Sequence, residues 1–251
     1  MADLDSIQAR WEPKRRNIRS QFANDGRRLS YKRLSDRQRA KMLQPFLAAA
    51  NKIRGVIATF LVDRRIKSFF CPDDVAIGSD VFDRTTWKPK TLEKLLRVSH
   101  LGALLIAGLS RSKQHIFWIS DQDAITANLE KHKQATNAIA SVLTGYLPHQ
   151  LGHIRIGTAQ SDDGSMSIED ILAIPDIAAG AWSEISTSVS SRLGRVAHSV
   201  DVLATDNLLP KAHDILLWHS ENQHNLKRIA VVIEHVPHDQ FKAHLLHSFV
   251  E

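Results

Sequence analysis

Four short apolar runs, separated by longer segments with helical spacing, constrain the fold of this chain more than any other feature. The runs cover residues 55–63, 115–121, 153–159 and 228–236. Apolar runs of this length, rich in β-branched residues, are typical of strands buried in a sheet, and their alternation with helices favours parallel pairing. The sequence therefore predicts a helix-rich α/β protein, with three layers around a central mixed sheet.

Helical periodicity accounts for most of the remaining chain. The predicted helices begin near residues 3, 35, 91, 122 and 167, and end near residues 22, 50, 109, 143 and 192. Pro13 marks a boundary in the first of them, and Pro175 is predicted to lie in the first turn of a second helix within 167–192. Weaker patterns predict an extended piece at 28–34, a strand at 215–218 and a helix that carries His244 and His247.

The composition is that of a globular protein. The chain has 251 residues, of which 43% are hydrophobic and 24% charged, and these values exclude a disordered chain. A single cysteine, Cys71, excludes a disulfide framework and a cysteine-based zinc ribbon. No apolar run is long enough for a membrane span, and the N-terminus lacks the apolar core of a signal peptide. We therefore expect a cytoplasmic protein with no membrane partner.

Positive charge is concentrated at the N-terminus. Through Lys41 the chain has twelve Lys or Arg against five Asp or Glu, whereas the remaining 210 residues have 21 against 22. A block of one sign is the pattern expected for binding a nucleic-acid backbone. A solvated helical face and an acidic protein partner are the alternatives. The predicted nucleic-acid-binding residues are Lys14, Arg15, Arg16, Arg19 and Lys32.

Three acidic residues form a candidate metal site. Asp121 ends the apolar strand 115–121, Asp123 lies two residues further on, and Asp176 precedes a stretch rich in small residues, Ile177-Ala178-Ala179-Gly180-Ala181. Ligands of open α/β sheets lie outside the carboxyl ends of the strands, and carboxylates without Cys or paired His suit Mg²⁺ or Mn²⁺. Helix capping by Asp123 and Asp176 is the alternative interpretation.

The order of several segments carries a resemblance. The strand Phe117-Trp118-Ile119-Ser120-Asp121 is followed by a helix, the strand 153–159, the acidic turn Ser161-Asp162-Asp163 and the stretch IEDILAIPDIAAGA at 168–181. This order resembles the bacterial, ribonuclease-H-like "domain of unknown function 3800" family, whose members carry a hydrophobic "ADliAg" helix motif. Leu29-Ser30-Tyr31-Lys32 is similar to the "elK" segment of that family.

The resemblance implies a ribonuclease-H-like fold with a carboxylate cluster that binds a divalent metal. By motif, Asp121 matches the acid that ends the central strand, and Asp176 matches the acid of the last helix. Asp162 or Asp163 matches a polar turn before that helix. The division expected on this basis is a basic helical segment at 1–24, a ribonuclease-H-like core at 25–192 and a C-terminal extension at 193–251 that packs on the core.

One part of the family pattern is not found. Family members open with a strand that bears Asp-Glu-Ser-Gly and supplies the first carboxylate, and we expect this strand to be missing here. Loss of one ligand should cripple two-metal hydrolysis, because the attacking water is no longer placed. Asp63 or Glu234 is the candidate substitute, each lying in or at the end of a predicted strand.

Histidines are frequent near the C-terminus, which leaves a zinc site as an alternative. Because there is no HExxH arrangement and no cysteine partner, scattered surface histidines are the favoured interpretation. The serine-rich stretch 183–191 is interpreted as the end of a helix, and no glycine-rich nucleotide loop occurs. The histidines are His198, His213, His219, His224, His235, His238, His244 and His247.

The leading hypothesis is a metal-dependent nuclease or nucleic-acid-processing factor. In it Asp121 and Asp176 hold Mg²⁺ or Mn²⁺, and Asp123 positions water or a second ion. The alternative is a catalytically incomplete binding or assembly module of the same fold, in a bacterial defence or mobile-element system. A homo-oligomer or a protein partner would then supply the missing elements. A third possibility is an effector that acts through protein–protein contacts, in which residues 1–22 dock a partner helix.

Overall fold

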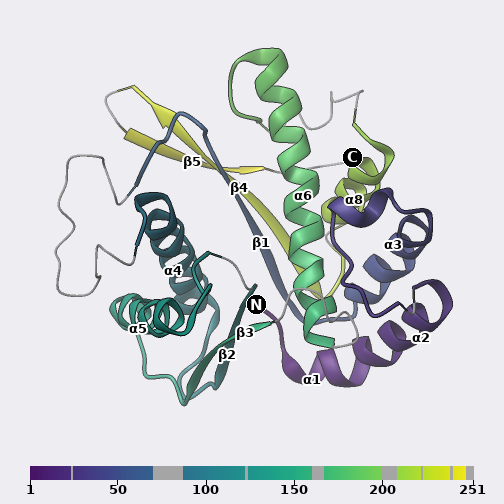
Figure 1. Ribbon diagram of the computed structural model, residues 1–251, viewed down its shortest axis with the longest axis horizontal. Coiled ribbons are helices and arrows are strands. Elements are labelled where there is room, and N and C mark those ends of the chain that lie inside the picture. The colour runs from purple at the N-terminus through teal and green to yellow at the C-terminus, as the bar shows by residue number, and fades with distance from the viewer. Residues whose placement is uncertain are drawn as a thin grey trace. The chain divides into compact units, whose positions relative to one another are not determined.

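The computed structural model describes residues 1–23, 25–69, 87–121, 124–159, 167–198, 208–221, 223–237 and 240–246. These residues form a helix-rich α/β structure that includes a mixed sheet, as predicted (Figure 1). The α-helices are α1 (Leu4–Ser6), α2 (Glu12–Phe22), α3 (Arg37–Ala50), α4 (Pro89–Leu109), α5 (Leu129–Tyr146), α6 (Ser167–Leu193) and α8 (Pro210–Ser220). The strands are β1 (Gly55–Val62), β2 (Ile116–Asp121), β3 (Ile154–Ala159), β4 (Leu226–Val236) and β5 (Gln240–Leu246).

The chain divides into two compact units. The first combines Met1–Ile66 with Asp162–Glu251, and the second is Lys67–Ser161. The expected boundaries after residues 24 and 192 do not coincide with this division. Ile7, Trp11 and Ile18 lie in the same hydrophobic core as residues of α6 and α8, so the N-terminal segment is an integral part of the first unit.

The first unit is built on a three-stranded mixed sheet. β1 pairs in parallel with β4, and β4 pairs antiparallel with β5. Val62 lies opposite Ile233, so Asp63 and Glu234 follow at the carboxyl end of the parallel pair. The predicted strands at 55–63 and 228–236 are therefore confirmed, and they adjoin although 163 residues separate Val62 from Leu226 in the sequence numbering.

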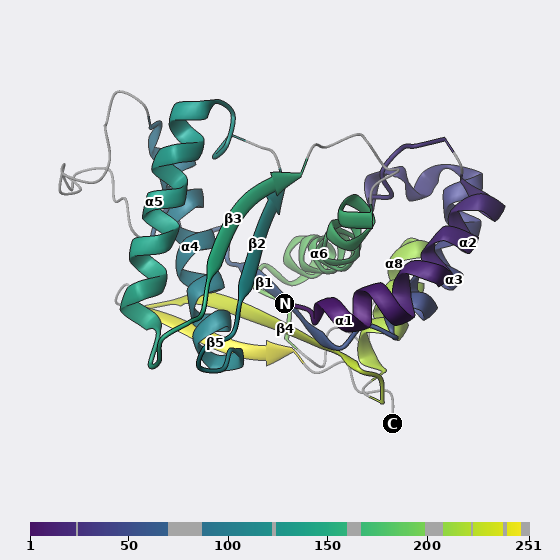
Figure 2. The ribbon, with the colours of Figure 1, turned by 90° about the horizontal axis from the view of Figure 1, so that it is seen from below.

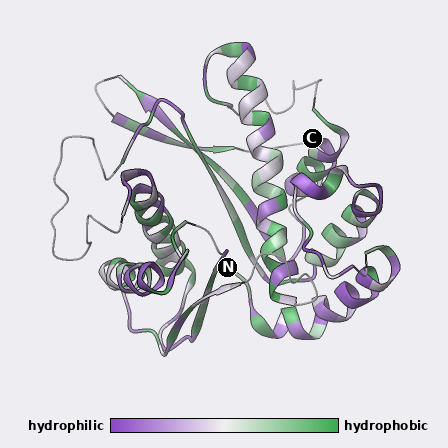
Figure 3. Ribbon diagram, in the orientation of Figure 1, coloured by the Kyte–Doolittle hydropathy of each residue, from purple (hydrophilic) through white to green (hydrophobic). Residues whose placement is uncertain are grey.

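Helix α6 is the central helix of this unit. It packs against β1 and α8, and α8 also contacts α3 and β4 (Figure 2). Fully buried side chains from four segments meet in the main core: Trp11, Phe46, Ile177 and Ile215. Figure 3 shows that α2 is largely hydrophilic, in contrast to the hydrophobic β1 and β4. Burial of one apolar stripe per helix against apolar strands explains why these helices form.

The second unit contains the parallel pair β2–β3 and the helix pair α4–α5. Its core joins Leu95 of α4 and Ala135 of α5 to the strand residues Trp118 and Ile156. At Gly102 an added Cβ would lie 2.1 Å from the Trp118 ring, so glycine allows α4 to approach β2 closely. The predicted strands at 115–121 and 153–159 and the helix at 91–109 are confirmed.

Some local predictions were wrong, because tertiary packing outweighs local pattern. Pro175 does not begin a new helix but lies inside the continuous α6, where burial of Ile174 and Ile177 compensates for the missing backbone donor. Residues 215–218 lie in α8, and His244 lies on β5, which gains hydrogen bonds from the edge of β4. Lys32–Ser35 forms a 3₁₀ turn in place of an extended piece.

Some helices begin at residues other than those predicted. The first helix does change at Trp11, where a π-helical turn (Ile7–Trp11) ends and α2 begins with Pro13 in its first turn. Helix α3 is capped by Asp36, whose carboxylate accepts from the backbone N–H groups of Gln38 and Arg39. Helix α5 begins after the cap Asn128, later than predicted. Within the described ranges, no helix is long and apolar enough to cross a membrane.

Candidate functional site

Two of the five predicted nucleic-acid-binding residues are buried in ion pairs. Arg15 Nη1 lies 3.0 Å from Asp170 Oδ2, and Arg19 Nε lies 2.9 Å from the same oxygen. Asp170 is fully buried near the start of α6, and both arginine side chains are less than a tenth exposed. A buried carboxylate is stable as an ion only when it is paired in this way. Arg15 and Arg19 are therefore structural counter-charges.

Acidic partners engage other members of the basic block as well. Glu12 accepts from Arg15 Nε and from Arg16 Nε, both at 2.7 Å. Hydrogen bonding by Arg15, which outweighs the opposing effect of burial, holds the pKa of Glu12 below its usual value. Arg28 lies 4.0 Å from the buried Glu169. Lys14, Arg16 and Lys32, the other predicted nucleic-acid-binding residues, are exposed.

Asp176 takes part in docking the segment that contains Tyr31. Its Oδ2 accepts a hydrogen bond of 3.0 Å from the Tyr31 backbone N–H, and the Tyr31 hydroxyl donates to Glu184, about two turns further along α6. An added Cβ on Gly180 would lie 2.2 Å from the Tyr31 ring. Asp176 and Gly180 thus pack the Tyr31 segment against α6.

The other acids of the predicted metal site lie elsewhere or outside the described residues. Asp121 is exposed at the carboxyl end of β2 in the second unit, whereas Asp176 belongs to the first. Asp123, Asp162 and Asp163 lie outside the described residues. The Mg²⁺ or Mn²⁺ site formed by Asp121 and Asp176 therefore stays a prediction.

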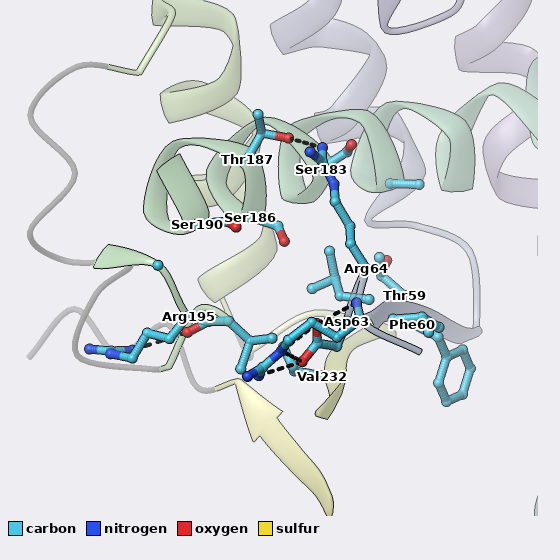
Figure 4. Close-up of a pocket in the computed structure, with 16 residues that line it drawn as sticks. Thr59, Phe60, Asp63, Arg64, Ser183, Ser186, Thr187, Ser190, Arg195 and Val232 are labelled. Carbon is cyan, nitrogen blue, oxygen red and sulfur yellow. Dashed lines mark hydrogen bonds and ion pairs between the residues drawn. The ribbon is translucent and has the colours of Figure 1, made fainter. Parts of the chain in front are cut away.

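A cavity of about 310 Å³ lies at the carboxyl end of β1 (Figure 4). It is bounded by the end of β1, by one face of α6 and by the segment that follows α6. The position agrees with the general placement of ligand sites in α/β sheets, outside the carboxyl ends of parallel strands. Its polar lining consists of Thr59, Asp63, Arg64, Arg65, Ser183, Ser186, Thr187, Ser190 and Arg195.

The α6 wall of the cavity is a stripe of hydroxyl groups. Ser183, Ser186, Thr187 and Ser190 recur at helical spacing and line the cavity, while Ile185 and Val189 on another face are fully buried. The sequence interpretation of 183–191 as the end of a helix missed this stripe. The available signal was the i, i+3, i+4, i+7 spacing of the hydroxyl residues, which indicates one face of a helix.

Three arginines and one aspartate give the cavity a positive balance. Asp63 is paired with Arg65 (Oδ2 to Nη2, 2.7 Å) and accepts from the backbone N–H of Arg65 and of His235. Burial alone would raise the pKa of Asp63, but these donors hold it below its usual value, so the carboxylate stays ionised. Arg64 reaches across to α6 and donates to Thr187 Oγ1 at 3.1 Å (Figure 4). Arg195 lies at the rim, with its guanidinium directed away from Asp63.

One group of side chains in the first unit has the composition of a metal site. His198, Glu234 and His244 each offer one ligand atom, and these atoms lie within 4.8 Å of one another. Val232, which lines the cavity, pairs with His244 across the β4–β5 hairpin. Glu234, a predicted substitute ligand, thus lies beside both the histidines and the cavity.

No known protein or family assigns a function to these residues. Comparisons of the chain with known protein families, with curated proteins and with solved structures found no match. The function is therefore inferred from the residues of the first unit.

Proposed function

We propose that the protein binds the phosphate groups of a nucleic acid in the cavity between β1 and α6, and that it acts as a nucleic-acid-processing factor. The observation that carries this proposal is the gathering of Arg64, Arg65 and the α6 hydroxyl stripe around one cavity. Guanidinium and hydroxyl groups are the side-chain donors that commonly contact phosphate oxygens. The excess of arginine over aspartate in the lining favours an anion.

The size and surroundings of the cavity support the same ligand. A volume of about 310 Å³ is at the lower end of the usual range for small-ligand sites and accommodates a nucleotide-sized group. Lys14, Arg16 and Lys32 are exposed in the same unit and can contact backbone phosphates further along a strand. The contribution of these three residues to affinity is expected to depend on the salt concentration and not on the base sequence of the nucleic acid.

Fluorescence polarisation with labelled single-stranded DNA, double-stranded DNA and RNA tests this binding. Arg64→Gln removes one guanidinium and should weaken binding about tenfold, the loss expected for one charge-assisted hydrogen bond. Ser186→Leu fills the cavity from the hydroxyl stripe without a change in charge and should weaken binding by at least as much. Arg111→Gln, which changes an exposed arginine of the other unit, is the matched control. Equal affinities for all three variants would refute the cavity as the binding site.

We also propose metal-dependent phosphodiester hydrolysis of the ribonuclease-H-like type, which rests on the family resemblance. Asp121 and Asp176 would hold Mg²⁺ or Mn²⁺, because carboxylate oxygens are the ligands that these ions prefer. The ion would supply an activated water and stabilise the leaving oxygen. Cleavage of single- and double-stranded substrates in the presence of Mg²⁺ tests this step, with Asp121→Asn expected to abolish it. Cleavage that persists in Asp121→Asn would exclude this residue as a ligand.

A catalytically incomplete binding module is the second candidate function. The hydrogen bond from the Tyr31 N–H to Asp176 favours it, because one oxygen of the proposed metal ligand is already used in packing. Binding without cleavage under any divalent metal would support this function. A cytoplasmic location is proposed for either case, since the single cysteine fits a reducing compartment.

A further inference from the structure

The β4–β5 hairpin and the segment after α6 bring three metal-ligating side chains to one point. His244 pairs with Val232 across the hairpin, so Glu234 is its diagonal neighbour two residues along β4. Residues two apart on a strand share a face of the sheet, and diagonal pairs of long side chains can touch. His198, from the segment that follows α6, completes the group.

The distances within this group are close to those of a coordination sphere. Glu234 Oε2 lies 3.0 Å from His244 Nε2 and 3.8 Å from His198 Nε2. The two imidazole rings are 5.3 Å apart and tilted by 36°, and each directs Nε2 at the same carboxylate oxygen. Ligand atoms of a tetrahedral zinc ion, with bonds of about 2.0–2.1 Å, are about 3.3 Å apart. Small side-chain rotations are therefore enough to place the three atoms around one ion.

The surroundings orient the carboxylate. Glu234 Oε1, the oxygen that does not face the histidines, lies 3.7 Å from Arg65 Nη2, and Arg65 is itself held by Asp63. An outer partner of this kind fixes a ligand's orientation at metal centres. The side chains of all three candidate ligands are partly exposed.

We propose that His198, Glu234 and His244 bind a divalent transition metal ion, of which Zn²⁺ is the best match. Two imidazoles and one carboxylate suit Zn²⁺, whereas Mg²⁺ prefers oxygen ligands alone. Three protein ligands leave a fourth position for water or substrate, as in catalytic zinc sites. Two residues that line the cavity adjoin this group. Val232 lies opposite His244, and Val196 lies two residues before His198. The cavity and the group are therefore formed by neighbouring residues of the same strand and segment, and metal binding itself does not depend on the proposed function.

Isothermal titration calorimetry, in which Zn²⁺ alone is added to the metal-free 251-residue chain, tests the site. One ion per chain is expected, and His244→Gln and Glu234→Gln should each weaken binding by about 100-fold or more, above the effect of losing an outer partner. His213→Gln, an exposed histidine of α8 outside the group, is the matched control and should bind as the unchanged protein does. Thermal unfolding without metal shows whether each variant is folded.

Co²⁺ absorption gives a second readout that a loss of folding cannot mimic. Cobalt in the site should give the intense visible bands of four- or five-coordinate geometry, without the thiolate band that binding at Cys71 would add. Zn²⁺ should displace it. Binding that is equally strong in His244→Gln, Glu234→Gln and His213→Gln, or a thiolate band, would overturn the proposal, and so would the absence of any Zn²⁺ binding. Nucleic-acid affinity measured on the same variants without metal separates this proposal from the function proposed above.

Discussion

Two pairs of arginines in the first unit have opposite surroundings. Arg15 and Arg19 are buried against Asp170, which is itself inaccessible to solvent. Arg64 and Arg65, at the end of β1, are exposed at the cavity, and the Arg65 side chain is 53% exposed. The comparison shows that the density of positive charge along the sequence does not distinguish buried arginines from exposed ones. Burial depends on partners that are distant in the sequence, such as Asp170.

The physical reason is the cost of desolvation. A buried guanidinium needs a carboxylate close by, and the pair then stabilises packing but offers no charge to a ligand. Arg64 is exposed and donates to the neutral hydroxyl of Thr187, so it pays little of this cost and an incoming phosphate competes easily for it. The structural pair should therefore matter for stability, and the cavity pair for binding.

The largest effect is expected from loss of the buried carboxylate. Asp170→Asn removes the carboxylate that pairs with Arg19 and leaves Arg15 paired with Glu12, and the free energy of unfolding should fall by about 3–5 kcal/mol. Chemical denaturation measures this loss. Asp5→Asn, an exposed acid in the first turn of α1, is the control and should cost less than about 1 kcal/mol. An equally small loss for Asp170→Asn would remove the distinction between the two pairs.

The buried His219 shows how the protein interior changes the pKa of a basic side chain. Burial, together with the nearby Arg228, lowers the pKa of His219 to about 4 from an ordinary 6.5. The unfolded chain therefore binds a proton that the folded protein does not, so this contribution to stability is complete above pH 6.5 and is lost as the pH falls towards 4.

Between pH 7 and pH 5 the free energy of unfolding should fall by about 2 kcal/mol through His219 alone. The variant His219→Phe, whose ring can replace the edge contact with Trp182, should lack this part of the pH dependence. Denaturation at both pH values measures the difference. A pH dependence that is the same in the variant would show that His219 is not the responsible group.

A weaker buried pair sharpens the comparison. Glu169 is 1% exposed, and the nearest guanidinium atom in its pair with Arg28 lies at 4.0 Å, whereas Asp170 has two arginines at about 3 Å. Glu169→Gln is therefore expected to cost about 1–2 kcal/mol, less than Asp170→Asn. Denaturation of the two variants side by side tests the order. The reverse order would mean that the distance between guanidinium and carboxylate does not govern these pairs.

The smallest effect on stability is expected from the exposed lysines. Lys14→Gln and Lys32→Gln should change the free energy of unfolding by no more than about 0.5 kcal/mol. If these residues contact phosphates, each substitution should reduce the salt dependence of nucleic-acid binding by about 0.7–0.9 in log–log slope. Unchanged slopes would confine phosphate binding to the cavity.

The sequence predicted the strands better than the site. Apolar runs such as Gly55–Val62 carry their own pattern, so the strands and the α/β class follow from them. The pairing of β1 with β4 depends on residues far apart in the chain, and no local pattern encodes it. For the same reason the partners of Arg15 and Arg19 were unpredictable, since Asp170 is more than 150 positions away.

Several residues of the site were identified in the sequence, but other roles were predicted for them. Asp63 and Glu234 were expected only as substitutes for a missing ligand, yet they lie at adjoining positions in the first unit. His198 and His244 were interpreted as scattered surface histidines, because only the hairpin register brings His244 next to Glu234. The hydroxyl stripe of α6 lies within the predicted helix, but the end of β1 that faces it across the cavity is distant in the sequence.

The most direct test of the cavity as the phosphate site is an NMR titration that observes arginine Nε–Hε signals. Adding a short oligonucleotide to the labelled protein should shift the signal of Arg64 and leave those of Arg15 and Arg19 in place. Shifts of the Arg15 and Arg19 signals with no change at Arg64 would contradict the account and return the binding site to the N-terminal basic block.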